Sequence, residues 1–184
     1  MSKLILASAS PRRRELLAQA GYVFEVCPAH IDETRGEDEK PAAYVARLAL
    51  EKAMAIHAQH PDAIVLGADT TVVLGGEVLS KPQTIEEAEC MLRTLSGHTH
   101  QVHTGIAVVS GKGQRTHVET TNVEFVPIPE EELAEYLASG DSLDKAGAYG
   151  IQGYAARWIP RIEGDFFNVM GLPLAATARL LSGL

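Results

Sequence analysis

The sequence predicts one α/β domain built on a mixed β-sheet, and three observations support that prediction. Apolar runs of strand length alternate along the chain with amphipathic stretches of helix length. Hairpin patterns interrupt this alternation near the middle, which indicates antiparallel strands beside parallel ones. The chain has 184 residues, 46% of them hydrophobic and 22% charged, without an internal repeat or an obvious linker. We therefore expect a single domain over residues 1–184.

The N-terminal third of the chain is expected to form two strands and two helices. Leu4–Ala7 is a continuously apolar run, typical of a buried strand. Ser10 and Pro11 suit the N-cap and first position of a helix, which ends at Gly21. The segments that follow are a strand at 22–27, an exposed acidic loop at 32–40 and an alanine-rich helix at 41–59.

The middle of the chain combines a buried strand, a hairpin and a capped helix. The apolar run 63–66 predicts the strand, and the two glycines at 75–76 predict the hairpin turn. Thr84 and Glu87 have the spacing of a capping box, so a helix begins there and stops near Gly97.

The remaining elements follow from alternation, amphipathicity and the positions of glycine. The strand 101–110 alternates, with Val102, Ile106 and Val108 on one face, and the strand 115–126 is expected to pair with it. The other expected segments are strands at 71–74, 77–80 and 154–162, helices at 129–139 and 173–181, and a glycine-rich loop at 141–153.

Composition argues against several classes of function. The net charge of −8 and the 5% aromatic content do not suit a surface that grips nucleic acid or anionic lipid. No segment is long enough to span a bilayer, and the apolar run at the N-terminus is too short for a signal peptide. Cys27 and Cys90 match no zinc or redox spacing. We expect a cytoplasmic protein that binds neither nucleic acid nor membrane.

The first helix carries three cations in its first turn, Arg12, Arg13 and Arg14. Cations oppose the helix dipole at this end, which favours anions. A bound polyanion would reverse that conflict, because backbone N–H groups, the Ser8 hydroxyl and the guanidinium groups would converge on phosphate. The alternative is a solvated basic patch.

Two carboxylates and two lysines are further candidates. Asp69 follows the buried run 63–66, and ligands usually bind where strands of open α/β sheets end, so Asp69 can hold Mg²⁺ or orient a water. Glu33 in the acidic loop can be a second oxygen ligand. Lys52 interrupts the apolar stripe of its helix and points inward, and it or Lys81 can neutralise a phosphate oxygen. The alternatives are a turn-forming Asp69, a solvated Glu33 and a Lys52 that reaches along the helix to water.

Two conspicuous patterns lack the form of known cofactor motifs. The glycine-rich segment 144–153 allows a backbone to approach a ligand closely. It does not match GxGxxG, and the chain has no Walker A motif, which disfavours Rossmann dehydrogenases and P-loop kinases. His98, His100 and His103 cannot all face one zinc ion from a single strand, because side chains alternate between its faces.

Short segments along nearly the whole chain, in order, resemble the Maf family of nucleotide pyrophosphatases. They are Leu6–Arg13, Ile31–Glu33, Leu50–Ala53, Gly67–Thr70, Lys81-Pro82, Ser96–His100, Asp144–Gly147 and Gly171–Leu174. The resemblance implies an elongated α/β fold, similar to that of inosine triphosphate pyrophosphatases, with a central cleft between two lobes. It also implies cleavage of a nucleoside triphosphate between the α and β phosphates, with a divalent metal cation, Mg²⁺ or Mn²⁺.

The same resemblance implies roles for individual residues. Asp69 is then the general base, and Glu33 and Asp69 are the metal ligands. The residues implied to bind phosphate are Ser8, Arg13, Lys52 and Lys81.

Subgroups of the family differ at three positions, which hold Arg12, Thr70 and Gln152 here. That set resembles the dTTP/UTP pyrophosphatases and not the sister subgroup that acts on 7-methyl-GTP. Arg12 would repel the cationic methylated guanine, whereas the Thr70 hydroxyl and the Gln152 amide can hydrogen-bond an uncharged pyrimidine. We therefore expect hydrolysis of dTTP and UTP, or of modified pyrimidine nucleotides, in a housecleaning role.

Three other functions stay open. A non-catalytic nucleotide-binding regulator of septum formation agrees with the family's name, although the carboxylate of Asp69 favours an enzyme. A phosphatase would release orthophosphate instead of pyrophosphate. A purely structural protein would leave the basic turn and the inward Lys52 unexplained. The resemblance also allows a homodimer.

Overall fold

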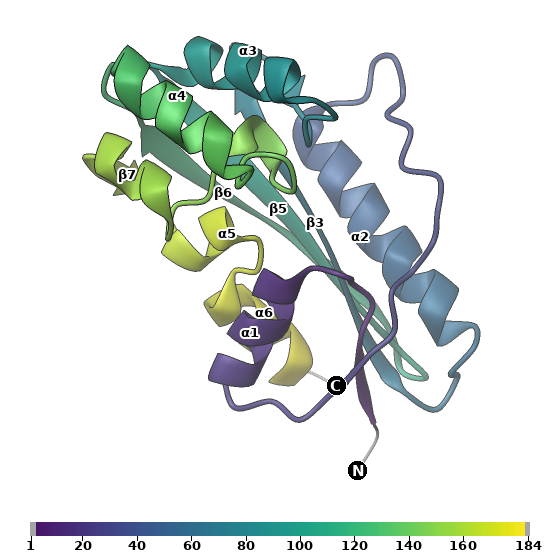
Figure 1. Cartoon of the computed structure of the whole chain (residues 1–184). Helices are drawn as coiled ribbons and strands as arrows, with labels where there is room; N and C mark the ends of the chain where they lie inside the picture. The colour runs from purple at the N-terminus through teal and green to yellow at the C-terminus, as the bar shows by residue number, and fades with distance from the viewer. Residues whose placement is uncertain (1–2, 183–184) are drawn as a thin grey trace. The chain divides into compact units, whose positions relative to one another are not determined.

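The computed structural model describes residues 3–182, which form a β-sheet flanked by helices (Figure 1). The helices are α1 (Pro11–Gln19), α2 (Pro41–His57), α3 (Ile85–Leu95), α4 (Glu130–Ser139), α5 (Phe166–Met170) and α6 (Leu174–Ser182), with 3₁₀ helices η1 (Ala146–Ala148) and η2 (Tyr154–Trp158). The strands are β1 (Leu4–Leu6), β2 (Glu25–Val26), β3 (Ile64–Leu74), β4 (Glu77–Leu79), β5 (Thr99–Ser110), β6 (Gly113–Glu124) and β7 (Arg161–Glu163). Within this part of the chain, no helix has both the length and the apolar character that a membrane span needs.

The sheet has seven strands in the order β2-β1-β3-β5-β6-β7, and β4 pairs with β3. Strand β1 runs parallel to β2 and β3, whereas β4 is antiparallel to β3 and β7 is antiparallel to β6. Helices α1 and α2 provide the long connections that parallel neighbours require. The predicted α/β fold with a mixed sheet and flanking helices is confirmed.

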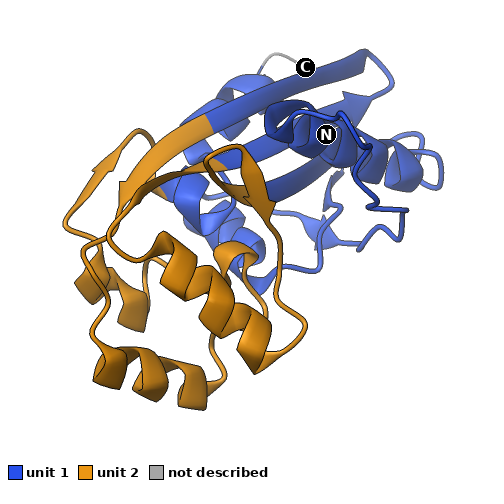
Figure 2. Ribbon diagram, turned by 90° about the horizontal axis from the view of Figure 1, so that it is seen from above, with its two compact units in different colours: residues 1–70, 103–119, 167–184 blue, residues 71–102, 120–166 orange. Residues whose placement is uncertain are grey.

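The chain divides into two compact units (Figure 2). Unit 1 contains residues 1–70, 103–119 and 167–184, and unit 2 contains residues 71–102 and 120–166. Strands β3, β5 and β6 each continue from one unit into the other along the chain. Asp69 and Thr70 are the last residues of β3 that belong to unit 1.

In unit 1, α2 packs very closely on the sheet because two strand residues have no side chain. A Cβ atom on Gly67 of β3 would lie 2.2 Å from the backbone oxygen of Ala49. One on Gly105 of β5 would lie 2.2 Å from the backbone oxygen of Val45. Apolar clusters fill the rest of the unit. The two glycines thus set the distance between α2 and the strands.

Unit 2 has a core of aromatic side chains. The ring of Trp158 meets Tyr136 edge-on at 5.4 Å between centroids, and Phe125 meets Tyr149 in the same manner at 4.8 Å. The His100 Nε2 atom lies 2.7 Å from the Tyr149 hydroxyl, and burial lowers the pKa of His100 to about 4. At neutral pH His100 is therefore an uncharged part of the core.

Strand β3 corrects a prediction near Asp69. The pattern indicated one strand at 63–66 and a separate hairpin strand from Thr71, but β3 runs without a break over Ile64–Leu74. Gly67 marks the closest approach of α2 and not the end of a strand. Asp69 therefore lies inside a strand.

The structure also corrects the predictions for residues 154–162. Residues 154–162 form η2 and the start of β7 instead of one strand, because Ala155 and Trp158 are buried at the three-residue spacing of a 3₁₀ helix.

Strand β5 is buried on both faces from Val102 to Val109, so its predicted alternation is wrong. Strand β2 is shorter than predicted, since the aromatic side chains before it pack into the core. Helix α5 was not predicted, because five residues are too few for a periodic signal.

Candidate active site

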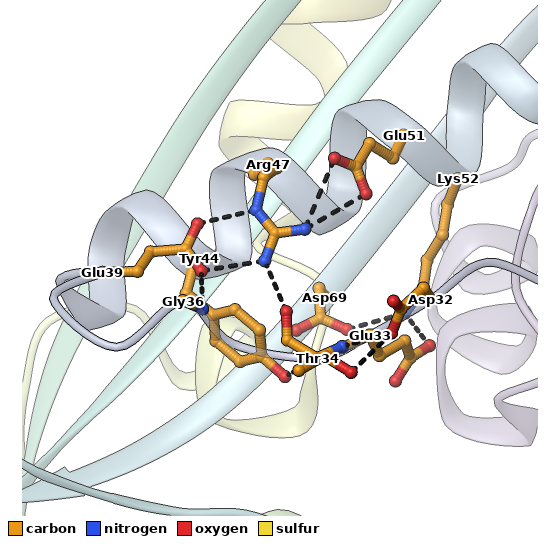
Figure 3. A network of polar contacts seen from close by, with 10 residues as sticks. All are labelled: Asp32, Glu33, Thr34, Gly36, Glu39, Tyr44, Arg47, Glu51, Lys52 and Asp69. Carbon is orange, nitrogen blue, oxygen red and sulfur yellow. Dashed lines mark hydrogen bonds and ion pairs between the residues drawn. The ribbon is translucent and has the colours of Figure 1, made fainter.

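Lys52 lies on the buried face of α2, and its ammonium group meets two carboxylates (Figure 3). The Lys52 Nζ atom is 2.7 Å from Asp69 Oδ1 and 2.7 Å from Glu33 Oε1. Lys52 is only 8% exposed and Asp69 9%, whereas the Glu33 side chain is more than half exposed. The inward direction predicted for Lys52 is confirmed. Pairing of this kind offsets much of the cost of burying the two charges.

The geometry of β3 brings Asp69 to this lysine. Gly67 and Asp69 are two residues apart in one strand, so both lie on the face that α2 covers. A Cβ on Gly67 would lie 2.9 Å from the backbone nitrogen of Ala53, the residue after Lys52. The absent side chain at Gly67 thus lets α2 come close enough for Lys52 and Asp69 to pair.

The acidic loop that carries Glu33 is tied to α2 at two points (Figure 3). The Tyr44 hydroxyl donates to the Glu33 backbone oxygen at 2.9 Å, and Arg47 Nη2 donates to the Thr34 backbone oxygen at 3.1 Å. The Asp32 carboxylate closes a turn by accepting from the Thr34 backbone N–H at 2.9 Å. These contacts hold the backbone on both sides of Glu33 although the loop is exposed.

Arg47 is the main support of this loop. Its guanidinium group donates to both carboxylate oxygens of Glu39, at 2.7 and 2.8 Å, and to Glu51 at 3.2 Å. The hydrogen bonds from Arg47 lower the pKa of Glu39 to about 2, so this pair stays charged at neutral pH. Sequence reasoning missed both Arg47 and Tyr44, because nothing in the pattern of a helix shows which loop will fold onto it.

Arg13 is the arginine of the basic turn that reaches across unit 1. Its Nε donates to the Gly171 backbone oxygen at 2.8 Å, its Nη1 to Ser8 Oγ at 3.1 Å and its Nη2 to Thr70 Oγ1 at 2.9 Å. Burial lowers the pKa of Arg13, and the charge of Asp69 opposes that shift. A guanidinium group has five N–H donors, so two remain to donate to an anion.

The start of α1 confirms the predicted cap. Ser10 Oγ accepts from the Arg13 backbone N–H at 3.4 Å, and Pro11 holds the first helical position. Of the three arginines in this turn, Arg13 therefore forms hydrogen bonds inside unit 1, whereas Arg12 is partly exposed and Arg14 is exposed.

Most of the predicted site residues lie in unit 1 as two groups joined through β3. One group contains Ser8, Arg13 and Thr70, and the other contains Glu33, Lys52 and Asp69. Lys81 and Gln152 are exposed residues of unit 2. Sequence reasoning also missed Thr104, which lies 2.9 Å from Thr70 between the hydroxyl oxygens.

The two carboxylates suit a divalent cation that also binds phosphate. Oxygens of Glu33 and Asp69 both lie 2.7 Å from the Lys52 ammonium nitrogen, so the two carboxylates already meet at a cationic group. Magnesium usually takes one or two carboxylates from a protein, with water and substrate phosphates in its other positions. Within residues 3–182, no three His, Cys, Asp or Glu side chains gather in a way that could hold a metal. An ion held by these two carboxylates would therefore need water and substrate phosphates for its other positions.

Comparison with known proteins gives one family. Residues 3–184 match the family described as Maf-like protein. The dTTP/UTP pyrophosphatase of Geobacillus sp. (strain WCH70) is 51% identical, over 97% of this chain and 96% of the relative. That of Symbiobacterium thermophilum is 52% identical, over 99% of this chain and 94% of the relative.

Solved structures are also similar over part of the chain, and one of them serves as an example. It is that of a nucleoside-triphosphatase / dITP/XTP pyrophosphatase from Mycobacterium abscessus, with a TM-score of 0.47 and 16% identity. The match covers 69% of this chain and 76% of the other. The family is shown by the match over residues 3–184 and by the sequence relatives.

Proposed function

This chain belongs to the family of Maf-like proteins, and from that premise we propose that it hydrolyses dTTP and UTP to the nucleoside monophosphate and pyrophosphate. The relatives that carry this activity in their names match nearly the whole chain at about half identity. A role in clearing unwanted pyrimidine nucleotides, including modified ones, follows from such a reaction. Nucleotide pools are cytoplasmic, so the proposal places the protein in the cytoplasm.

The observation that carries the proposal is the contact of Lys52 with Asp69 and Glu33. An ammonium group has three protons, and two of them meet these carboxylates. We assign Asp69 the role of general base, because one of its oxygens accepts from Lys52 while the other would be able to accept a proton from water. Removal of that proton would let the water attack the α-phosphorus and release pyrophosphate.

Binding and charge stabilisation are assigned to the cationic and hydroxyl groups nearby. Arg13, with two N–H groups still able to donate, and Ser8 would hold phosphate oxygens, and the third proton of Lys52 would do the same. Lys81 is assigned to phosphate from the family pattern. By the same family pattern, the three positions that distinguish the subgroups, Arg12, Thr70 and Gln152, would face the pyrimidine base.

Glu33 and Asp69 would hold Mg²⁺ or Mn²⁺, since hard carboxylate oxygens suit either ion. When bound, such an ion supplies positive charge that offsets the charge developing on the phosphate oxygens. Tyr44 donates to the Glu33 backbone oxygen and Arg47 to that of Thr34, so the backbone that carries the Glu33 carboxylate is held on α2.

Two further expectations belong to the proposal. The two lobes around one cleft, implied by the resemblance, and a homodimer are expectations for this chain. A regulator of septum formation that binds nucleotide without turnover is not favoured, since the relatives that match nearly the whole chain are named as pyrophosphatases.

A product assay tests the proposal. The purified chain is incubated with Mg²⁺ or Mn²⁺ and, separately, with dTTP, UTP, CTP, GTP and 7-methyl-GTP, and the products are separated. We expect dTMP or UMP with pyrophosphate, and little turnover of 7-methyl-GTP. A diphosphate with orthophosphate would indicate a phosphatase, and tight binding without turnover would indicate the regulator.

A further inference from the structure

A chain of hydrogen bonds in unit 1 runs from Arg13 through two threonines to a backbone oxygen. Arg13 Nη2 lies 2.9 Å from Thr70 Oγ1, and Thr70 Oγ1 lies 2.9 Å from Thr104 Oγ1. Thr104 Oγ1 then lies 3.0 Å from the backbone oxygen of Asn168. Thr104 is fully buried in β5, so water does not compete for its hydroxyl group.

The protons in this chain can be placed by their chemistry. A guanidinium nitrogen only donates, a backbone carbonyl only accepts, and each hydroxyl group has a single proton. Thr104 must give its proton to Asn168, because the carbonyl oxygen has none to offer. Thr70 must then donate to Thr104 while it accepts from Arg13. Only this assignment makes all three hydrogen bonds.

The direction of these bonds determines what Thr70 can offer a ligand. Its proton is committed to Thr104 and one lone pair to Arg13, so one lone pair remains. We propose that Thr104 is a specificity-determining residue, which makes Thr70 an acceptor and so selects pyrimidines that carry a proton on N3. The inference rests on the proposed function, in which Thr70 faces the base.

This selection separates thymine and uracil from cytosine. Thymine and uracil have an N3–H that can donate to the Thr70 oxygen, whereas cytosine has a bare N3 with a lone pair of its own. Gln152 does not make the distinction, because its amide can turn to present either its NH₂ group or its oxygen. The 5-methyl group does not alter N3, so dTTP and UTP are treated alike. An acceptor left facing another acceptor lowers affinity by about tenfold or more.

Substitutions at Thr104 test the assignment through the ratio of kcat/KM for UTP to kcat/KM for CTP. Thr104→Val frees the Thr70 proton to point at a bare N3, so we expect the ratio to fall by about tenfold, through a gain with CTP. Thr104→Ser keeps the hydroxyl group and should keep the ratio. Thr177→Val, at another fully buried threonine of unit 1, controls for the loss of a buried hydroxyl.

An altered substrate tests the same point with the wild-type chain, so the result does not depend on whether a variant folds. In 3-deaza-CTP a C–H group replaces N3, which removes the opposing lone pair. We expect it to be hydrolysed about tenfold faster than CTP in kcat/KM. Equal rates for 3-deaza-CTP and CTP, or a folded Thr104→Val chain with the wild-type ratio, would overturn the inference. If the wild-type chain released no pyrophosphate from UTP, the proposed function itself would fall, and the inference with it.

Discussion

Single residues of the site act through partners that fix their geometry. Arg13 shows this most clearly, because its planar fork donates to Gly171, Ser8 and Thr70 at once. A lysine at the same position would keep the charge but would be a single point donor at the end of a flexible stem. The direction of the remaining N–H groups is therefore as important as the charge itself.

Arg13→Lys should reduce kcat/KM for UTP by about 10- to 100-fold, because one charge-assisted hydrogen bond to phosphate is worth about 1.5–3 kcal/mol. Steady-state kinetics with UTP measure the effect. Arg14→Lys is the matched control, since Arg14 is the next residue of the same helix and is exposed. If the two variants had equal kinetics, Arg13 would not hold the substrate.

Single residues could be predicted from the sequence where a local rule, such as helix capping or an apolar stripe, determines their position. Ser10 and Pro11 obey the capping preferences of helices, and Lys52 breaks an apolar stripe, so both features could be predicted. Thr104 could not, because its role depends on Thr70, which is far from it in the chain. A threonine in a buried strand gives no signal of the hydroxyl that it will meet.

Close packing of helix α2 on the sheet determines where the site residues lie. Helix α2 rests on β3 and β5 where these strands carry Gly67 and Gly105. The ion pair of Lys52 with Asp69 depends on this contact, because Lys52 is on α2 and Asp69 follows Gly67 by two residues in β3. The packing of backbone on backbone thus determines a distance between side chains.

Gly67→Ala should lower the free energy of unfolding by about 2–3 kcal/mol, because the new Cβ meets backbone atoms that move only with the whole helix. It would lie 2.2 Å from the Ala49 oxygen. Turnover of UTP in any folded fraction should fall as well, since α2 carries Lys52 away from Asp69. Urea unfolding and kinetics measure the two effects.

Gly111→Ala is the control for this substitution. No atom lies within 4 Å of a Cβ at Gly111, and the residue is exposed. Its effect on unfolding should stay within about 0.5 kcal/mol. If Gly67→Ala were as mild as Gly111→Ala, the close contact with α2 would not support the site.

Elements with a local signal were predicted well, and those determined by packing were not. The helix start at Thr84, whose hydroxyl accepts from the Glu87 backbone N–H, and the glycine turn at 75–76 are confirmed by α3 and by the β3–β4 hairpin. The sequence could not show that β3 continues through Gly67, because a glycine that accommodates a helix has the same appearance as a glycine that ends a strand. Likewise, the aromatic segment 154–158 was predicted as a strand, and only its packing in unit 2 explains the 3₁₀ helix.

Across the whole molecule, the order of the short segments predicts the family, whereas no single segment does. Each segment alone had an ordinary structural explanation, from a basic patch to a turn-forming aspartate. Their order along the chain predicted the family, and the match over residues 3–184 confirms it. The chemistry proposed for the chain then rests on Asp69, which pairs with the buried Lys52 in unit 1.

The most direct measurement is the fate of the attacking oxygen. UTP is hydrolysed in heavy-oxygen water, with Asp69→Asn in parallel, and mass spectrometry locates the label in the products. Attack on the α-phosphorus predicts one labelled oxygen in UMP, unlabelled pyrophosphate, and little product from folded Asp69→Asn. Label in pyrophosphate with unlabelled UMP would contradict attack at the α-phosphorus, and near-normal turnover by Asp69→Asn would contradict the role of Asp69.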